Sequence, residues 1–197
     1  MAPFKQTPSQ TVGPYFAYGL TPEQYGYEMK SIAGSAVATD DAAGERIRIE
    51  GRVFDGEGAP ISDAMIEIWQ ADGQGRYAHP SGGRDSNSTF KGFGRCGTGT
   101  DPAHRFWFDT VKPGSADGKS APHINVTVFM RGILVHAFTR IYFPEESALN
   151  ERDPVLLCVP AERRKTLMAE RVSITGLPVY RFDIHMQGER ETAFFDV

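Results

Sequence analysis

Apolar and polar residues alternate strictly at the start of the regular part of the chain. In RIRIEGRV (46–53), Ile47, Ile49, Gly51 and Val53 alternate with charged residues, which is the period of a half-buried β-strand. Turn residues follow in DGEG (55–58). Similar patterns predict further strands at 64–70, 91–98, 104–111, 122–131, 134–143 and 180–187, with a short one near 192–196.

A single short helix is predicted, in the C-terminal half. Pro160 suits a helix start, and AERRKTLMAERV (161–172) consists largely of strong helix formers. Many short strands, one helix and no regular alternation of strand with helix predict an all-β fold, a β-sandwich over 45–197. Residues 1–44 are polar and interrupted by prolines, so we expect an extended N-terminal arm that lies on its own domain or docks on a neighbouring subunit.

Composition narrows the functional classes. The chain has 197 residues, 40% of them hydrophobic and 23% charged, which suits one globular domain. A net charge of −4 without a Lys/Arg cluster argues against a nucleic-acid partner. No apolar run approaches a membrane span and MAPFKQTPSQT has no apolar signal core, so we expect a cytoplasmic protein. Cys96 and Cys158 are expected to be buried free thiols.

The predicted strand at 122–131 carries the candidate chemistry. Its apolar residues fall on one face, while His123, Asn125 and Thr127 fall on the other. Two histidines at i and i+2 on a strand would point the same way and could share one metal ion. Here the second place holds Asn125, whose neutral amide is a poor ligand for iron or zinc.

A dense pattern of fixed positions lies in the segment 49–77. Its skeleton is Ile-x-Gly-x-Val (49–53), Gly58, Ile61, Ile-Glu-Ile (66–68) and Gly-x-Tyr (75–77). This pattern resembles the signature of the intradiol ring-cleavage dioxygenases. Among them, the chain looks most like the alpha chain of the enzymes built from two homologous subunits. The resemblance extends through TPSQTVGPYF (7–16), GFGRC (92–96), VKPG (111–114), APHIN (121–125), RIYF (140–143) and YRFDIHMQGERET (180–192).

The resemblance implies an enzyme that opens catechols with O2 at a non-haem iron(III), held by two tyrosinates and two histidines. Anionic phenolates suit this hard cation. Tyr77 matches the first tyrosine and His123 the first histidine, but Asn125 stands in the place of the second histidine. The stretch SADGKSA (115–121), where the second tyrosine should lie, has none. We therefore expect no metal on this chain, with Tyr77, His123 and Asn125 as vestigial ligand positions and the iron on a homologous beta subunit.

The resemblance also implies a role at the partner's site. Arg131 lies beside a glycine, which suggests a hairpin tip roughly 26 Å from His123 along an ideal strand. A guanidinium there suits an anionic benzoate, and Thr11, Gly13 and Pro14 of the arm would border the same pocket. The implied holoenzyme, a higher alpha-beta oligomer, converts 3,4-dihydroxybenzoate and O2 into 3-carboxy-cis,cis-muconate.

Two other interpretations remain open at this stage. In the first, the chain is a purely structural β-sandwich subunit, Arg131 is a solvated tip residue and the arm only docks. In the second, the chain is a self-sufficient dioxygenase with changed ligands, in which His79 or His136 would complete a site around Tyr77. The missing second tyrosine argues against the latter.

Overall fold

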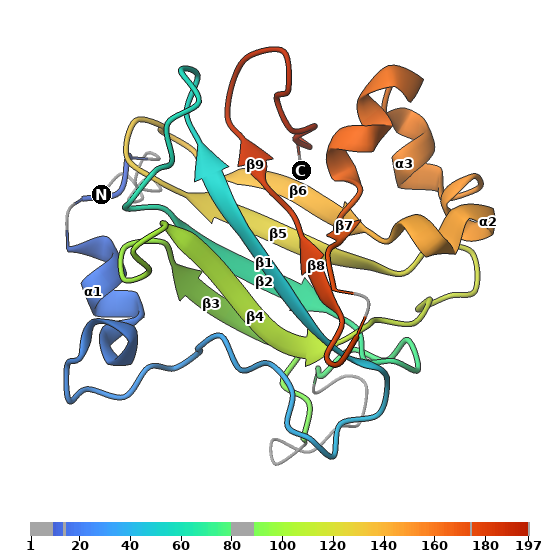
Figure 1. Ribbon diagram of the computed structural model, residues 1–197, viewed down its shortest axis with the longest axis horizontal. Coiled ribbons are helices and arrows are strands. Elements are labelled where there is room, and N and C mark those ends of the chain that lie inside the picture. Colours follow the sequence, from blue (N-terminus) through green and yellow to red (C-terminus); the bar gives the residue numbers. More distant parts are fainter. Residues whose placement is uncertain (1–9, 14, 80–88, 174, 197) are drawn as a thin grey trace, which may run out of the picture.

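The computed structural model describes residues 10–13, 15–79, 89–173 and 175–196, and its strands form two sheets (Figure 1). The alternation at 46–53 produces β1 (Arg46–Phe54), the central strand of the first sheet, with every second residue buried. Its partners are β4 (Arg105–Val111), antiparallel, and β8 (Val179–Arg181) and β9 (Ile184–His185), both parallel, while β7 (Glu170–Arg171) extends the sheet beyond β8.

The second sheet is antiparallel throughout. It runs in the order β3 (Phe93–Gly97), β2 (Met65–Gln70), β5 (His123–Phe129), β6 (Ala137–Tyr142). On β5 the predicted alternation holds, since Ile124, Val126 and Val128 are buried while His123 and Asn125 are partly exposed on the opposite face. The two sheets therefore lay their apolar faces against each other.

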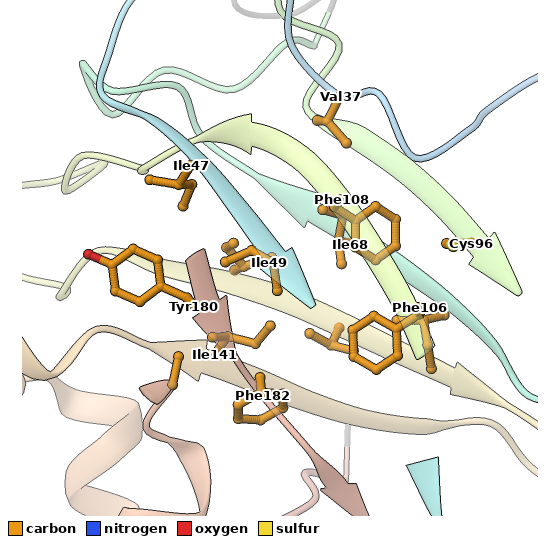
Figure 2. Close-up of a cluster of buried hydrophobic side chains, with 14 of the residues drawn as sticks. Val37, Ile47, Ile49, Ile68, Cys96, Phe106, Phe108, Ile141, Tyr180 and Phe182 are labelled. Carbon is orange, nitrogen blue, oxygen red and sulfur yellow. The ribbon is translucent and has the colours of Figure 1, made fainter. Parts of the chain in front are cut away.

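The core between the sheets consists of branched aliphatic and aromatic side chains. Figure 2 shows Ile47 and Ile49 of β1 and Phe106 and Phe108 of β4 among them, with Ile68 of β2. All five are almost completely buried, which makes burial of apolar surface the main stabilising term. The predicted all-β sandwich is confirmed.

The helical prediction needs correction. The sequence predicts one helix over 161–172, but η4 (Ala161–Leu167) is a 3-10 helix and ends early. The backbone N–H of Ala169 bonds the Tyr142 carbonyl oxygen at 2.9 Å, so tertiary pairing pulls the chain into an extended path against its helix propensity. Within the described ranges, the other short helices are α1 (Phe16–Leu20), η1 (Pro22–Tyr25), η3 (Pro144–Glu146), α2 (Ser147–Asn150) and α3 (Pro154–Cys158).

The helical turn that Pro22 suggests is present as η1, and α3, which is not predicted from the sequence, also has a local signal. The Asp153 carboxylate caps α3 by accepting hydrogen bonds from the N–H groups of Val155 and Leu156, and Pro154 occupies the first helical turn. Asp-Pro is a typical helix start. The same helix also corrects the prediction for Cys158, which is exposed at its C-terminal end, whereas Cys96 is buried as expected.

Several strand boundaries differ from the pattern. The segment 134–143 becomes extended only at Ala137, and 192–196 contributes only a single bridge, between Phe195 and Phe138. The predicted strand at 180–187 is split, because the Asp183 carboxylate accepts the N–H of Arg52 at 3.0 Å in place of a ladder carbonyl. A side-chain acceptor of this kind interrupts the regular pairing of backbone groups.

The described part of the N-terminal segment divides into two. Val37 is fully buried in the sandwich core, and Ala36 bridges Asp109, so the stretch near 33–42 belongs to the chain's own domain. The preceding stretch exposes several large apolar side chains, namely Tyr15, Tyr18, Tyr27, Met29 and Ile32. No helix within the described ranges has the length and apolarity needed to cross a membrane.

Candidate functional site

The vestigial ligand positions lie together on the outward face of the second sheet. His123 and Asn125 point the same way from β5, and Trp69 of β2 lies directly opposite Asn125. On the other side of β5, Tyr142 lies opposite His123 and Arg140 lies opposite Asn125. Directly opposed residues of an antiparallel pair are neighbours on one face, so the register alone builds this cluster.

Tyr77 joins the cluster from the loop after β2. The loop folds back through Gly75, whose φ is +78° and whose added Cβ would lie 2.0 Å from the Ser115 carbonyl oxygen. The Tyr77 ring then stacks on Trp69, with 5.6 Å between ring centroids. Burial raises the pKa of Tyr77 above its ordinary value of 10.0, although the Arg140 charge and a hydrogen bond with Asn125 oppose this. Tyr77 is therefore a neutral phenol near pH 7.

His123 is held as a neutral imidazole. Burial lowers its pKa, and the Arg140 charge lowers it further, against the effect of a hydrogen bond to Ala121. Its Nδ1 lies 2.8 Å from the Ala121 carbonyl oxygen, so the neutral ring donates from Nδ1 and keeps the lone pair on Nε2. The Asn125 amide donates a long hydrogen bond, 3.4 Å, to the Trp69 carbonyl oxygen.

These residues do not fit iron(III). The donor set is at most one phenol, one imidazole and one amide, with the Arg140 guanidinium on the same face. Iron(III) is a hard cation that favours several anionic oxygen ligands, and this set offers at most one. Within the part of the chain that the structure describes, no three His, Cys, Asp or Glu side chains could hold a metal ion together. His136, which could have served as a substitute ligand, lies near the other end of β5. Its ring contacts those of Phe129 and Phe138, with 5.3 Å and 4.6 Å between centroids.

A second group of predicted residues meets at the turn after β5. Arg131 lies beyond the end of β5 rather than on the strand, in a turn that Gly132 closes with a φ of +93°. The Arg131 side chain is 61% exposed, and its Nε pairs with the Asp63 carboxylate. The backbone N–H of Gly132 donates to the Thr11 hydroxyl at 3.1 Å. The structure thus brings Thr11 to the Arg131 turn.

The arm and this turn enclose a shallow apolar hollow of about 230 Å³. The Phe16 ring from α1 contacts the Phe129 ring of β5 at 5.5 Å between centroids, and the Gly13 carbonyl oxygen accepts the N–H of Phe16 at 3.1 Å. Pro14, the other predicted pocket residue, lies outside the described residues. The hollow is lined by Gln10, Val12, Phe16, Phe129, Met130, Ile133, Leu134 and His136.

Comparison with known proteins decides the family. The dioxygenase family model matches residues 13–188. The protocatechuate 3,4-dioxygenase alpha chain of Burkholderia cepacia is 59% identical over the full length of both chains. The chain belongs to the intradiol dioxygenase family. The resemblance drawn from the segment 49–77 is therefore confirmed.

Intradiol dioxygenases also include more distant relatives of this chain. The protocatechuate 3,4-dioxygenase beta chain of Burkholderia cepacia is 31% identical, over 98% of this chain and 84% of that one. An intradiol ring-cleavage dioxygenase from Tetranychus urticae has the same fold, with a TM-score of 0.61 at 17% identity, covering 92% of this chain and 94% of that one. This intradiol dioxygenase chain therefore resembles both an alpha and a beta chain, the alpha chain more closely.

Two residues of this intradiol dioxygenase's candidate sites are not singled out by the sequence. Arg140 lies on β6, which pairs with β5 through the connection 130–136. Which residue of β5 it faces depends on the geometry of that turn, and the sequence does not specify this geometry. Asp63 has no local signal, since it lies 68 positions from Arg131 in the sequence. Only tertiary structure brings these partners together.

Proposed function

We propose that this chain is the alpha subunit of a protocatechuate 3,4-dioxygenase. The holoenzyme cleaves 3,4-dihydroxybenzoate with O2 to 3-carboxy-cis,cis-muconate. A homologous beta subunit holds iron(III), which supplies the activation of the bound catecholate and of O2. The alpha chain completes the substrate pocket and the scaffold of a hetero-oligomer. The names of the relatives, which include both alpha and beta chains, support this assignment.

The single observation that carries the proposal is the Thr11 to Gly132 hydrogen bond beside Arg131. It joins the arm to the turn on an exposed surface, while the chain's own ligand positions have a donor set unsuited to iron. A subunit with this arrangement exposes Arg131 and Thr11 at one edge, where they can line the substrate pocket of a partner chain. Gly13 borders the same surface, and Pro14 is assigned to it from the family resemblance.

In this role Arg131 binds the carboxylate of the substrate. Its hydrogen bond with Asp63 uses Nε, and in the described ranges no hydrogen bond joins its two terminal nitrogens to a carboxylate. Those two nitrogens suit a bidentate contact with a benzoate group. Asp63 then orients the guanidinium plane toward the pocket. The apolar hollow beside it supports docking of the partner chain.

The decisive experiment is substrate kinetics on the enzyme reconstituted with an iron-bearing beta chain. We expect Arg131→Ala to raise KM for 3,4-dihydroxybenzoate about tenfold, equivalent to about 1.4 kcal/mol, with a smaller effect on a catechol that lacks the carboxylate. Arg105→Ala is the matched control, because Arg105 is also a partly exposed arginine paired with an aspartate, Asp101. An unchanged KM in Arg131→Ala would favour the purely structural scaffold.

The placement of iron has its own test. Purified without the beta chain, this chain should contain far less than one iron per molecule and should show no visible tyrosinate-to-iron absorption band. Elemental analysis measures the iron content, and absorption spectra detect the band, in the separate and in the reconstituted chains. Stoichiometric iron with that band in the isolated chain would overturn the assignment of iron to the partner.

A further inference from the structure

Arg140 occupies the centre of the vestigial site. It lies directly opposite Asn125 across β5 and β6, so their Cβ atoms are about 5 Å apart. Its Nη1 lies 3.4 Å from the Tyr142 hydroxyl oxygen. Tyr142 in turn lies opposite His123, with 5.8 Å between their ring centroids. The guanidinium therefore shares one face with the former ligand positions.

The charge of Arg140 acts directly on the surviving ligand side chains. The strand register sets Arg140 opposite Asn125 and Tyr142 opposite His123, and it holds the guanidinium beside the remaining ligand positions. At such short range a positive charge acts on a neighbouring phenol and imidazole. The same charge would act on any cation placed between them.

No carboxylate forms an ion pair with Arg140 in the ranges that the structure describes. None of the ion pairs found there includes Arg140. Asp153, which lies beyond Tyr142, is fully buried and is already bonded to the Tyr142 hydroxyl and to the N–H groups of Ala121, Val155 and Leu156. Asp153 therefore makes no ion pair with Arg140, although its negative charge and that of Asp117 still act on His123.

We propose that Arg140 is a built-in cation that excludes metal ions from the vestigial site. Loss of metal binding then has two separate causes. One is the missing ligands, Asn125 in place of a histidine and the tyrosine-free segment 115–121. The other is a guanidinium fixed by strand register beside the positions that remain. Two like charges a few ångströms apart repel strongly in a partly desolvated site.

This proposal predicts that restoring a ligand is insufficient. The variant Asn125→His would add a second imidazole beside Tyr77 and His123, yet the guanidinium would still oppose a cation there. Removing the charge as well should permit binding. We therefore compare three full-length variants: Asn125→His, Asn125→His with Arg140→Gln, and Asn125→His with Arg140→Lys. Lysine keeps the positive charge, whereas glutamine keeps a hydrogen-bond donor for Tyr142.

The measurement is titration with Co²⁺, followed by its visible absorption and by calorimetry. We expect the Asn125→His, Arg140→Gln variant to bind one Co²⁺ at least about a hundredfold more tightly than the other two. Adding His123→Ala to it should abolish binding, which locates the ion. Equal affinity in all three variants, or no binding by the glutamine variant, would overturn the proposal.

A second neutral variant guards against loss of fold. This variant combines Asn125→His with Arg140→Met. Circular dichroism and thermal unfolding show whether each variant is folded. Unfolding of both neutral variants would also contradict the proposal, because Arg140 would then be required for structure. None of these measurements uses the partner subunit, so their failure leaves the proposed function untouched.

Discussion

The Thr11 hydroxyl accepts a hydrogen bond from the backbone N–H of Gly132 across 121 positions of sequence, at 3.1 Å. This contact ties the N-terminal arm to the turn that carries Arg131. Two segments that are far apart in the sequence therefore lie side by side at one edge of the molecule. A change at Thr11 should therefore be felt at Arg131.

Replacing Thr11 by valine tests this link. Valine keeps the shape and removes the acceptor, so the turn loses one exposed hydrogen bond, worth about 0.5 kcal/mol. In the reconstituted enzyme we expect KM for 3,4-dihydroxybenzoate to rise about two- to fivefold, with kcat nearly unchanged. Thr11→Ser keeps the hydroxyl and should behave like the parent protein. Equal KM values for the valine and serine variants would contradict the link.

Gly51 of β1 should not tolerate a side chain. An added Cβ would lie 1.9 Å from the Phe182 carbonyl oxygen and 2.8 Å from the Phe106 ring. Since both neighbours belong to the packed core, Gly51→Ala should lower the free energy of unfolding by about 3 kcal/mol. Gly34→Ala, with open space around the added atom, should change it by less than about 0.5 kcal/mol. Urea unfolding of both variants provides the comparison.

Lys112 should stabilise the fold in a pH-dependent way. Its ammonium lies 2.9 Å from Glu145 and 2.6 Å from Glu146 and is largely buried. Lys112→Met leaves both carboxylates without their cation, at an expected cost of about 2 kcal/mol near pH 7. Lys30→Met, which removes an exposed ion pair with Glu23, should leave stability unchanged.

The sign of the pH effect follows from Glu145. Burial raises its pKa, but hydrogen bonds from Tyr180 and Lys112 outweigh burial, and the net pKa is below the ordinary 4.5. A carboxylate whose pKa is lower in the folded chain than in the unfolded chain stabilises the fold at pH values above its unfolded pKa. This stabilisation is lost as the pH falls through its folded pKa. The difference between parent and Lys112→Met should therefore shrink below about pH 4.5. A difference that grows in acid would contradict this account.

The two cysteines should differ sharply in reactivity. Burial raises the pKa of Cys96 to about 11, so little of the reactive thiolate forms near pH 8. Cys158 is exposed at the end of α3. Brief treatment of the folded chain with iodoacetamide, followed by peptide mass spectrometry, should find the label on Cys158 and reach Cys96 only after denaturation. Comparable labelling of Cys96 in the folded chain would show that it is accessible.

Local pattern is sufficient for the fold class, and the resemblance to the intradiol dioxygenases adds the interpretation of Tyr77, His123 and Asn125 as vestigial ligand positions. The alternation around Ile49 predicts β1 because a strand places alternate side chains on opposite faces whatever its partners. The same rule places His123 and Asn125 on one face of β5. Compared with the ligand set that this resemblance implies, Asn125 and the tyrosine-free segment 115–121 predict the loss of two iron ligands.

Tertiary structure decided what lies beside those residues. The sequence predicts a helix over 161–172, but pairing of Ala169 with Tyr142 ends it at Leu167. Strand register, set by long-range packing, puts Arg140 opposite Asn125. The alternation of side chains along a strand is a local property of the backbone. Which residues of two distant strands lie opposite each other depends instead on the packing free energy of the whole core. The sequence, read beside the family that it resembles, predicts which ligands are missing from this site, and only the folded chain places a guanidinium on the same face as the remaining positions.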